Sequence, residues 1–117
     1  LDQKARLAFG SDWFVAPPTP LEGIYAAVTR RTLDDKNPGV WVPEQKITVE
    51  EALRAYTATG AYASFDESRK GVLAAGRLAD LVMLDRNIFE IPPGEIRNAK
   101  VMLTLVGGKP VFKRPAS

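Results

Sequence analysis

The sequence carries the same helix-start signal twice, and each signal is followed by an amphipathic stripe. Thr19–Glu22 and Thr48–Glu51 both read T-x-x-E, the capping-box pattern in which two side chains satisfy the first free backbone N–H groups of a helix. Apolar residues then recur at the i, i+3 and i+4 spacing of one helix face. The pattern predicts one helix over residues 20–31, with basic residues in its last turn. It predicts a second from residue 49 to about Gly60, which would cap it.

Short apolar runs bounded by turn residues make up a second pattern, which is typical of strands. The predicted strands cover residues 5–9, 79–85, 100–106 and 109–112. Gly107-Gly108 would form a two-residue hairpin turn, and Pro110 places the last strand at a sheet edge. The chain therefore divides into residues 1–67, with one strand and helices, and residues 68–117, with strands only. This predicts an α+β class and, with no Met at the start, a fragment of larger structures.

The composition excludes several classes of protein. The 117 residues are 45% hydrophobic and 26% charged, which is ordinary for one globular domain. No apolar run approaches the roughly 20 residues of a membrane helix, and the apolar stretch within residues 1–10 is shorter than a secretory signal needs. The net charge is +2, and the basic tail has only Phe112 near its charges. We therefore expect no membrane and no nucleic-acid partner, and the lack of cysteine favours the cytoplasm.

The chain contains no histidine and no cysteine. This removes the most common general base, the most common metal ligand, a thiol nucleophile and any Ser-His-Asp arrangement. Carboxylates are the candidates that remain. Asp80 and Asp85 flank a predicted strand and point to opposite faces, so they do not form a paired site. Both are interpreted as strand-end acids in turns.

Asp12 is the strongest candidate for chemistry. It follows a predicted buried strand within the motif G-S-D-W at residues 10–13. Parallel α/β folds present catalytic groups at the C-terminal ends of their strands. An aspartate in this position also caps turns by accepting backbone hydrogen bonds. On the residues alone, both interpretations stay open.

Four motifs together carry a resemblance to a known family. They are G-S-D-W at 10–13, E-A-L-x-x-Y-T at 51–57, G-x-L-x-x-G-x-x-A-D-L-V-x-L-D at 71–85, and V-G-G-K at 106–109. With these motifs, residues 5–113 resemble the C-terminal end of the amidohydrolase superfamily. The similarity is to its branch called amidohydrolase family 3, which includes N-substituted formamide deformylases.

The resemblance implies a (β/α)8 barrel with a metal centre, and a small β-sandwich built from both chain ends. Residues 5–12 would be the eighth barrel strand, and residues 71–112 the C-terminal share of the sandwich. Asp12 would contact a divalent metal, zinc by expectation, and accept a proton from the attacking water. Ser11 and Trp13 would lie in the substrate pocket. The other metal ligands of the family lie on strands that this chain lacks.

These implications favour the C-terminal portion of a metal-dependent amidohydrolase that acts on the C–N bond of an amide or formamide. We expect the chain alone to bind no metal and to be catalytically incompetent. Its partners would be the remainder of the parent barrel and a small-molecule amide, with a homo-oligomer possible. The alternative is a non-catalytic regulatory or interaction module that binds a partner through exposed apolar stripes.

Overall fold

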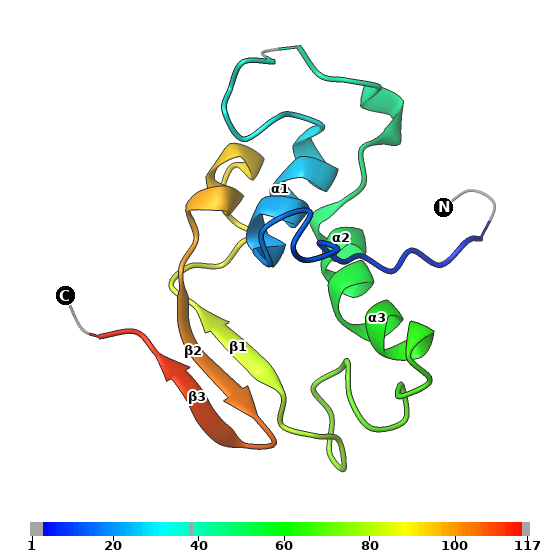
Figure 1. Cartoon of the computed structure of the whole chain (residues 1–117), viewed down its shortest axis with the longest axis vertical. Coiled ribbons are helices and arrows are strands. Elements are labelled where there is room, and N and C mark those ends of the chain that lie inside the picture. The colour runs from blue at the N-terminus through cyan, green and yellow to red at the C-terminus, as the bar shows by residue number, and fades with distance from the viewer. Residues whose placement is uncertain (1–3, 38, 116–117) are drawn as a thin grey trace.

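The computed structural model describes residues 4–37 and 39–115, and the chain is an α+β unit (Figure 1). Its α-helices lie in the first part of the chain, and its sheet and the 3-10 helix η2 lie in the second. The elements are α1 (Pro20–Thr29), η1 (Pro43–Gln45), α2 (Val49–Tyr56), α3 (Ala58–Ala63), β1 (Leu81–Leu84), η2 (Pro93–Asn98), β2 (Val101–Val106) and β3 (Lys109–Lys113). Within the described residues, no helix is long and apolar enough to cross a membrane.

The sheet is antiparallel, with strand order β1-β2-β3. Leu81 pairs with Leu105, and Leu103 pairs with Lys113. Gly107 and Gly108 have φ values of 55° and 77°, the positive pair that a type I′ hairpin turn requires. The hairpin and the edge position of β3 are confirmed.

The core lies between the helices and η2, beside the sheet rather than beneath it. Its buried residues are Ile24, Tyr25, Ala52, Ile88, Ile96 and Ala99. Among the described residues of β1, β2 and β3, none is buried, and all of β3 is exposed. The core therefore joins α1 and α2 to the segments on either side of η2, across residue 67.

The two capping signals behave differently. At α2 the capping box is complete: Glu51 N donates to Thr48 Oγ1 at 3.1 Å, and Thr48 N donates to Glu51 Oε2 at 2.8 Å. At α1 the Thr19 side chain makes no hydrogen bond to the helix backbone and donates instead to the Glu22 carboxylate. The predicted capping box is therefore confirmed at α2 and wrong at α1, where the proline at the first position sets φ for the helix.

The predicted helix ends need two corrections. The first helix stops at Thr29, and Arg30 follows in the left-handed conformation with φ of 56°, so no basic residue lies in the last turn. The second helix is interrupted at Thr57, whose hydroxyl donates back to Leu53 O at 2.8 Å. Such back-bonding competes with the regular helix. Gly60 consequently lies inside α3 and is not a cap.

The strand predicted at residues 5–9 is absent. This segment has no regular structure, and Ala5 and Ala8 are exposed. Phe9 N donates to Ala55 O at 3.1 Å, so the segment is tied to α2 rather than to a strand. A strand needs a neighbouring strand for its backbone groups, and the described residues place none beside it.

Two glycines of the motif at 71–85 have different structural roles. Gly71 and Gly76 both have positive φ, 89° and 81°. A Cβ at Gly71 would lie 2.7 Å from the Cβ of Ala61 and 3.1 Å from Thr57 O, whereas a Cβ at Gly76 would meet nothing within 4 Å. Gly71 therefore permits both the turn and the close approach of the loop to α3.

We expect Thr48→Ala to lower the free energy of unfolding by about 1 kcal/mol, because it removes a complete helix cap. Thr19→Ala is the matched control, since it changes the same residue in the same T-x-x-E pattern where no cap forms. Its loss should be clearly smaller. Denaturant unfolding of both variants measures the difference, and equal losses would contradict the assignment of the caps.

We expect Gly71→Ala to destabilise the protein more than Gly76→Ala. Both alanines bear the cost of positive φ, about 1–2 kcal/mol, but only the first also overlaps α3, which adds about 1–3 kcal/mol. Thermal or denaturant unfolding compares the pair. A Gly76→Ala loss as large as that of Gly71→Ala would show that contact with α3 is not what requires glycine at residue 71.

Candidate functional site

A cavity of about 470 Å³ lies where the segment before α1 meets α1 and α2. Its walls include Phe9, Ser11, Glu22, Leu33 and Tyr56. The G-S-D-W motif, the prolines before α1, and α1 itself therefore surround one space. Sequence reasoning had placed only Ser11 of these five residues in a pocket.

The three predicted site residues differ in their relation to this cavity. Ser11 is half-buried and forms part of the wall. Asp12 is the next residue, and it is exposed and begins a turn in which Val15 N donates to its backbone carbonyl at 2.7 Å. The turn is therefore closed by the backbone of Asp12 rather than by its carboxylate. Trp13 is 71% exposed and is not among the described wall residues.

Asp12 has a φ of 51°, in the left-handed region that Asp and Asn adopt more readily than most residues. This conformation follows directly after Gly10 and Ser11, so the chain turns sharply just after the cavity wall. Asp12, like Trp13, is not among the described wall residues.

Two aromatic residues form the floor of the cavity. The rings of Phe9 and Tyr56 meet edge to face, with centroids 5.4 Å apart, a favoured aromatic geometry. Burial raises the pKa of the Tyr56 phenol. A Cβ added at Gly23 in α1 would overlap the Tyr56 hydroxyl. A glycine inside a helix is the sequence signal for such a close approach, and it could have pointed to Tyr56.

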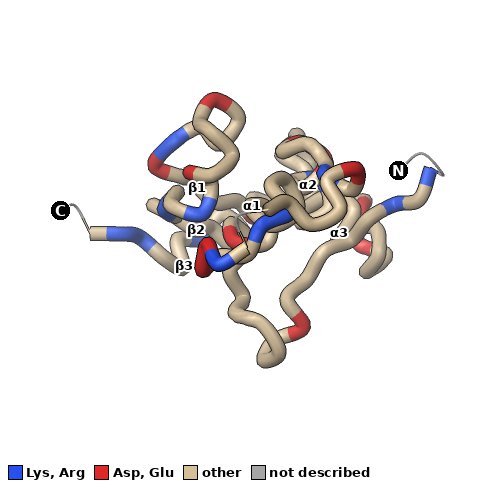
Figure 2. The backbone as a smooth tube through the Cα atoms, turned by 90° about the horizontal axis from the view of Figure 1, so that it is seen from above, with Lys and Arg blue, Asp and Glu red and all other residues tan. Residues whose placement is uncertain are grey.

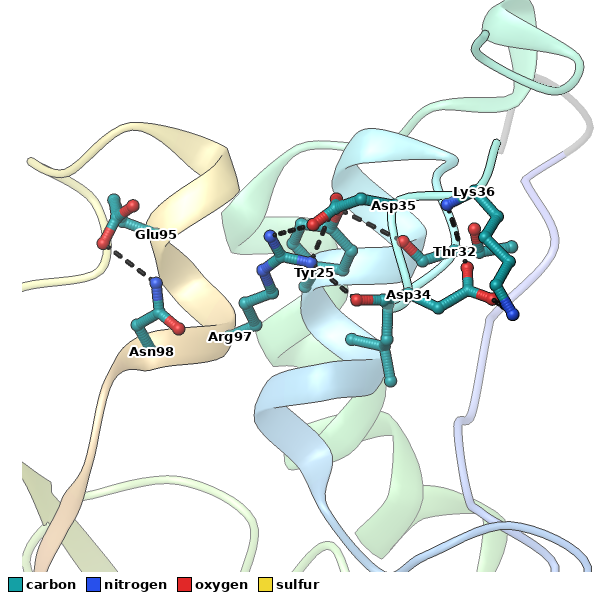
Figure 3. Close-up of polar contacts among 9 residues, drawn as sticks. Tyr25, Thr32, Asp34, Asp35, Lys36, Glu95, Arg97 and Asn98 are labelled. Carbon is teal, nitrogen blue, oxygen red and sulfur yellow. Dashed lines mark hydrogen bonds and ion pairs between the residues drawn. The ribbon is translucent and has the colours of Figure 1, made fainter. Parts of the chain in front are cut away.

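A polar cluster lies behind the cavity wall and joins η2 to the loop after α1 (Figure 3). Arg97 of η2 donates to both carboxylate oxygens of Asp35, from Nη1 at 3.2 Å and from Nη2 at 2.8 Å. Its Nη1 also donates to Leu33 O at 2.8 Å, and its guanidinium carbon lies 5.0 Å from the ring centroid of Tyr25. The hydrogen bonds from Arg97 hold the pKa of Asp35 below its usual range.

A larger cavity, of about 720 Å³, lies between α2, α3 and the start of β1. Glu50, Arg54, Lys70 and Asp80 contribute charges of both signs to its wall. Asp80 Oδ1 accepts from Gly107 N at 2.7 Å, which holds the hairpin turn against the start of β1. Asp80 therefore has a structural role at the start of β1.

Asp85 has the equivalent role at the other end of β1. Its Oδ1 accepts from Lys100 N at 2.8 Å, just before β2. The pKa of Asp85 is lowered, first by its hydrogen bonds to Arg86 and then by that backbone N–H. The interpretation of both acids as strand-end residues in turns agrees with these contacts.

The acidic side chains of the described residues do not form a metal-binding cluster. Figure 2 shows acidic and basic residues interspersed along both the helical and the sheet parts of the chain. Among residues 4–37 and 39–115, no three Asp or Glu side chains lie together as ligands for an ion, and the sequence has no His or Cys. The residues described here therefore do not fit a catalytic metal by themselves, since such a site uses about three protein ligands.

The chain is similar in sequence to several known proteins. It is 38% identical over 112 residues to the protein LONG AFTER FAR-RED 3 of Arabidopsis thaliana. The match covers 96% of this chain and 19% of the relative. It is 34% identical to N-substituted formamide deformylase of Arthrobacter pascens, over 100% of this chain and 21% of the relative. It is 30% identical to YtcJ of Bacillus subtilis (strain 168), which is named as an amidohydrolase. That match covers 92% of this chain and 20% of the relative.

The chain thus spans about a fifth of the length of the curated relatives it matches. No solved structure matches it. A family model described as the amidohydrolase family matches residues 1–112, which include all four motifs that carried the resemblance. Because this match covers nearly the whole chain, the chain belongs to the amidohydrolase family.

Proposed function

We propose that this chain is the C-terminal portion of a metal-dependent amidohydrolase that hydrolyses the C–N bond of a small amide or formamide. The family match supports the reaction class. The relative named N-substituted formamide deformylase, 34% identical over the whole chain, supports the choice of bond. The remainder of the parent barrel and the small amide would be the partners of this chain.

In this proposal residues 1–67 complete a (β/α)8 barrel, and residues 68–117 supply the C-terminal strands of a β-sandwich. The antiparallel sheet after residue 81 is compatible with the second part. The segment 5–12 would pair as a barrel strand only when neighbouring strands are present. This accounts for its irregular backbone here, where one hydrogen bond to Ala55 O holds it.

The position of the G-S-D segment carries the proposal. Ser11 lies in a cavity wall, and Asp12, the next residue, is exposed. A carboxylate in this place can act as a general base. Water oxygen attacks the carbonyl carbon while Asp12 accepts the water proton. The C–N bond then breaks as that proton passes to the leaving nitrogen.

A divalent metal, zinc in our proposal, would need ligands from outside this chain. The described residues provide no set of three ligands, so Asp12 would be the contribution of this chain to the metal. On this account the isolated chain hydrolyses nothing, and activity belongs to the intact parent protein.

Exposed aromatic residues favour a second candidate, a non-catalytic interaction module. Trp13 is 71% exposed, Phe14 84% and Phe65 92%. Trp13 and Phe14 are adjacent in the chain, and neighbouring exposed apolar side chains mark sites of interaction. In this case the chain would bind a partner through the turn after Asp12, and the carboxylate of Asp12 would be dispensable.

We expect Asp12→Asn to lower kcat of the intact protein by about 10²-fold or more, because general-base catalysis contributes 10²–10⁴-fold. Asparagine keeps the shape of the side chain and also tolerates positive φ. Amine release from N-butylformamide measures the rate. Glu44→Gln, an exposed acid on η1 away from the cavity, is the matched control and should leave it unchanged.

An Asp12→Asn protein that keeps its full rate would overturn the assignment of Asp12. Loss of a binding partner on Trp13→Ala, with no hydrolysis by the unmodified protein, would instead favour the interaction module.

A further inference from the structure

Leu33 connects the candidate cavity to a loop that has few local supports. The loop runs from the end of α1 to η1, and Leu33 forms part of the cavity wall that also contains Ser11. Leu33, Asp34, Asp35 and Lys36 are all exposed. Without a tie to the rest of the molecule, such a segment would take many positions relative to the cavity.

The contacts made within the loop cannot fix this position. Lys36 N donates to Asp34 Oδ1 at 3.2 Å, and the Lys36 amine lies 3.5 Å from Asp34 Oδ2. Both contacts shape the turn but move with it. At the far end, Arg30 Nε donates to Trp41 O at 3.1 Å, which holds the return of the loop to α1 rather than the region of Leu33.

Arg97 adds a second tie between the loop and the core, beside the Tyr25 hydroxyl, which donates to Thr32 O at 3.5 Å. The three hydrogen bonds of Arg97, one to Leu33 O and two to Asp35, join residues 62 and 64 positions apart. A guanidinium that bonds both carboxylate oxygens fixes orientation as well as distance. Arg97 is itself held over the Tyr25 ring, and Tyr25 is 2% exposed in the core. The chain of contacts therefore runs from the rigid core to Leu33.

We propose that Arg97 is a positioning residue for the candidate cavity. By fixing Leu33 and Asp35, it sets the part of the cavity wall that Leu33 forms and thereby limits the size of the apolar N-substituent that the cavity accepts. This inference rests on the proposed function for the identity of the ligand. It assigns to the second part of the chain a role in substrate selection, while the proton acceptor lies in the first part.

The proposal predicts that a substitution of Arg97 changes KM rather than kcat. Loosening Leu33 changes contacts with a bulky substituent but leaves Asp12 in place. In Arg97→Met we expect KM for N-butylformamide to rise about tenfold, the scale for altered contacts in an apolar pocket. The KM for N-methylformamide, which is too small to reach the wall, should change little, as should kcat for both.

Three further variants test whether the effect depends on the fork, the pair of hydrogen bonds from the Arg97 guanidinium to the two carboxylate oxygens of Asp35. Arg97→Lys keeps the charge over Tyr25 but not the fork, so it should resemble Arg97→Met. Asp35→Asn keeps a residue that tolerates the φ of 55° at this position and should show a smaller rise. Arg86→Met is the matched control, because Arg86 makes a similar fork, at 3.1 and 3.2 Å, to its neighbour Asp85, with no link to the cavity.

A readout that does not depend on turnover completes the experiment. Hydrogen exchange of residues 31–37 should be faster in the Arg97 and Asp35 variants of the intact protein than in the unmodified protein and in Arg86→Met. The methyl NMR signals of Leu33 should shift when N-butylformamide is added to the unmodified protein, and shift less in Arg97→Lys. If Arg97→Met does not fold, Asp35→Asn and Arg97→Lys carry the comparison.

The outcomes distinguish this inference from the proposed function. Unchanged exchange, or a Leu33 signal that does not respond to N-butylformamide, overturns the role of Arg97 even in an active enzyme. A protein that hydrolyses no formamide, yet shows the exchange and Leu33 responses, retains the positioning role and loses the proposed reaction.

Discussion

The structure depends on the packing of α1 against η2. Tyr25 and Ile96 are 2% and 0% exposed, and they belong to one apolar cluster. A fully buried side chain of this size contributes about 1.5–3 kcal/mol through the hydrophobic effect. Because the sheet contributes no buried residue within the described chain, this cluster is what joins the strand-rich part to the helices. Arg97, the next residue after Ile96, is carried by the same contact to the loop after α1.

The candidate site follows from that arrangement. The first part of the chain provides Ser11 in the cavity wall and the exposed Asp12 next to it. The second part reaches the cavity wall through Arg97 and the carbonyl of Leu33. In our proposal the proton acceptor and the wall that limits substituent size therefore lie in different parts of the chain. On that proposal, the size of the substrate could change without a change in the reacting groups.

Local sequence patterns correctly predicted the elements whose hydrogen bonds join residues close to one another in the sequence. The hairpin at Gly107-Gly108 and the cap of Thr48 were correct because their hydrogen bonds close within a few residues. The strand at residues 5–9 was wrong because a strand depends on a partner that no local pattern supplies. The cap at Thr19 was wrong although its motif is identical, since its hydroxyl donates to the Glu22 side chain and caps no backbone N–H of the helix.

The site was predictable to a smaller extent. The chemistry of an acid after Gly-Ser pointed to Asp12, and the G-S-D-W motif brought Ser11 to a cavity. Tyr56 lies in the second predicted helix, and its contact with the cavity depends on Gly23 in another helix. The contact of Arg97 with Asp35 spans 62 residues. One sequence gives no measure of such long-range pairs, because they arise from the way the helices pack.

A double-mutant cycle between Ile24 in α1 and Ile96 in η2 tests the shared core most directly. Ile24→Val, Ile96→Val and the double variant would be compared by denaturant unfolding of the intact protein. The account predicts that the two losses of stability are not additive and differ from their sum by about 0.5 kcal/mol or more, as expected for residues in one packed cluster. Losses that add within error would contradict it, because they would place the two side chains in independent parts of the molecule.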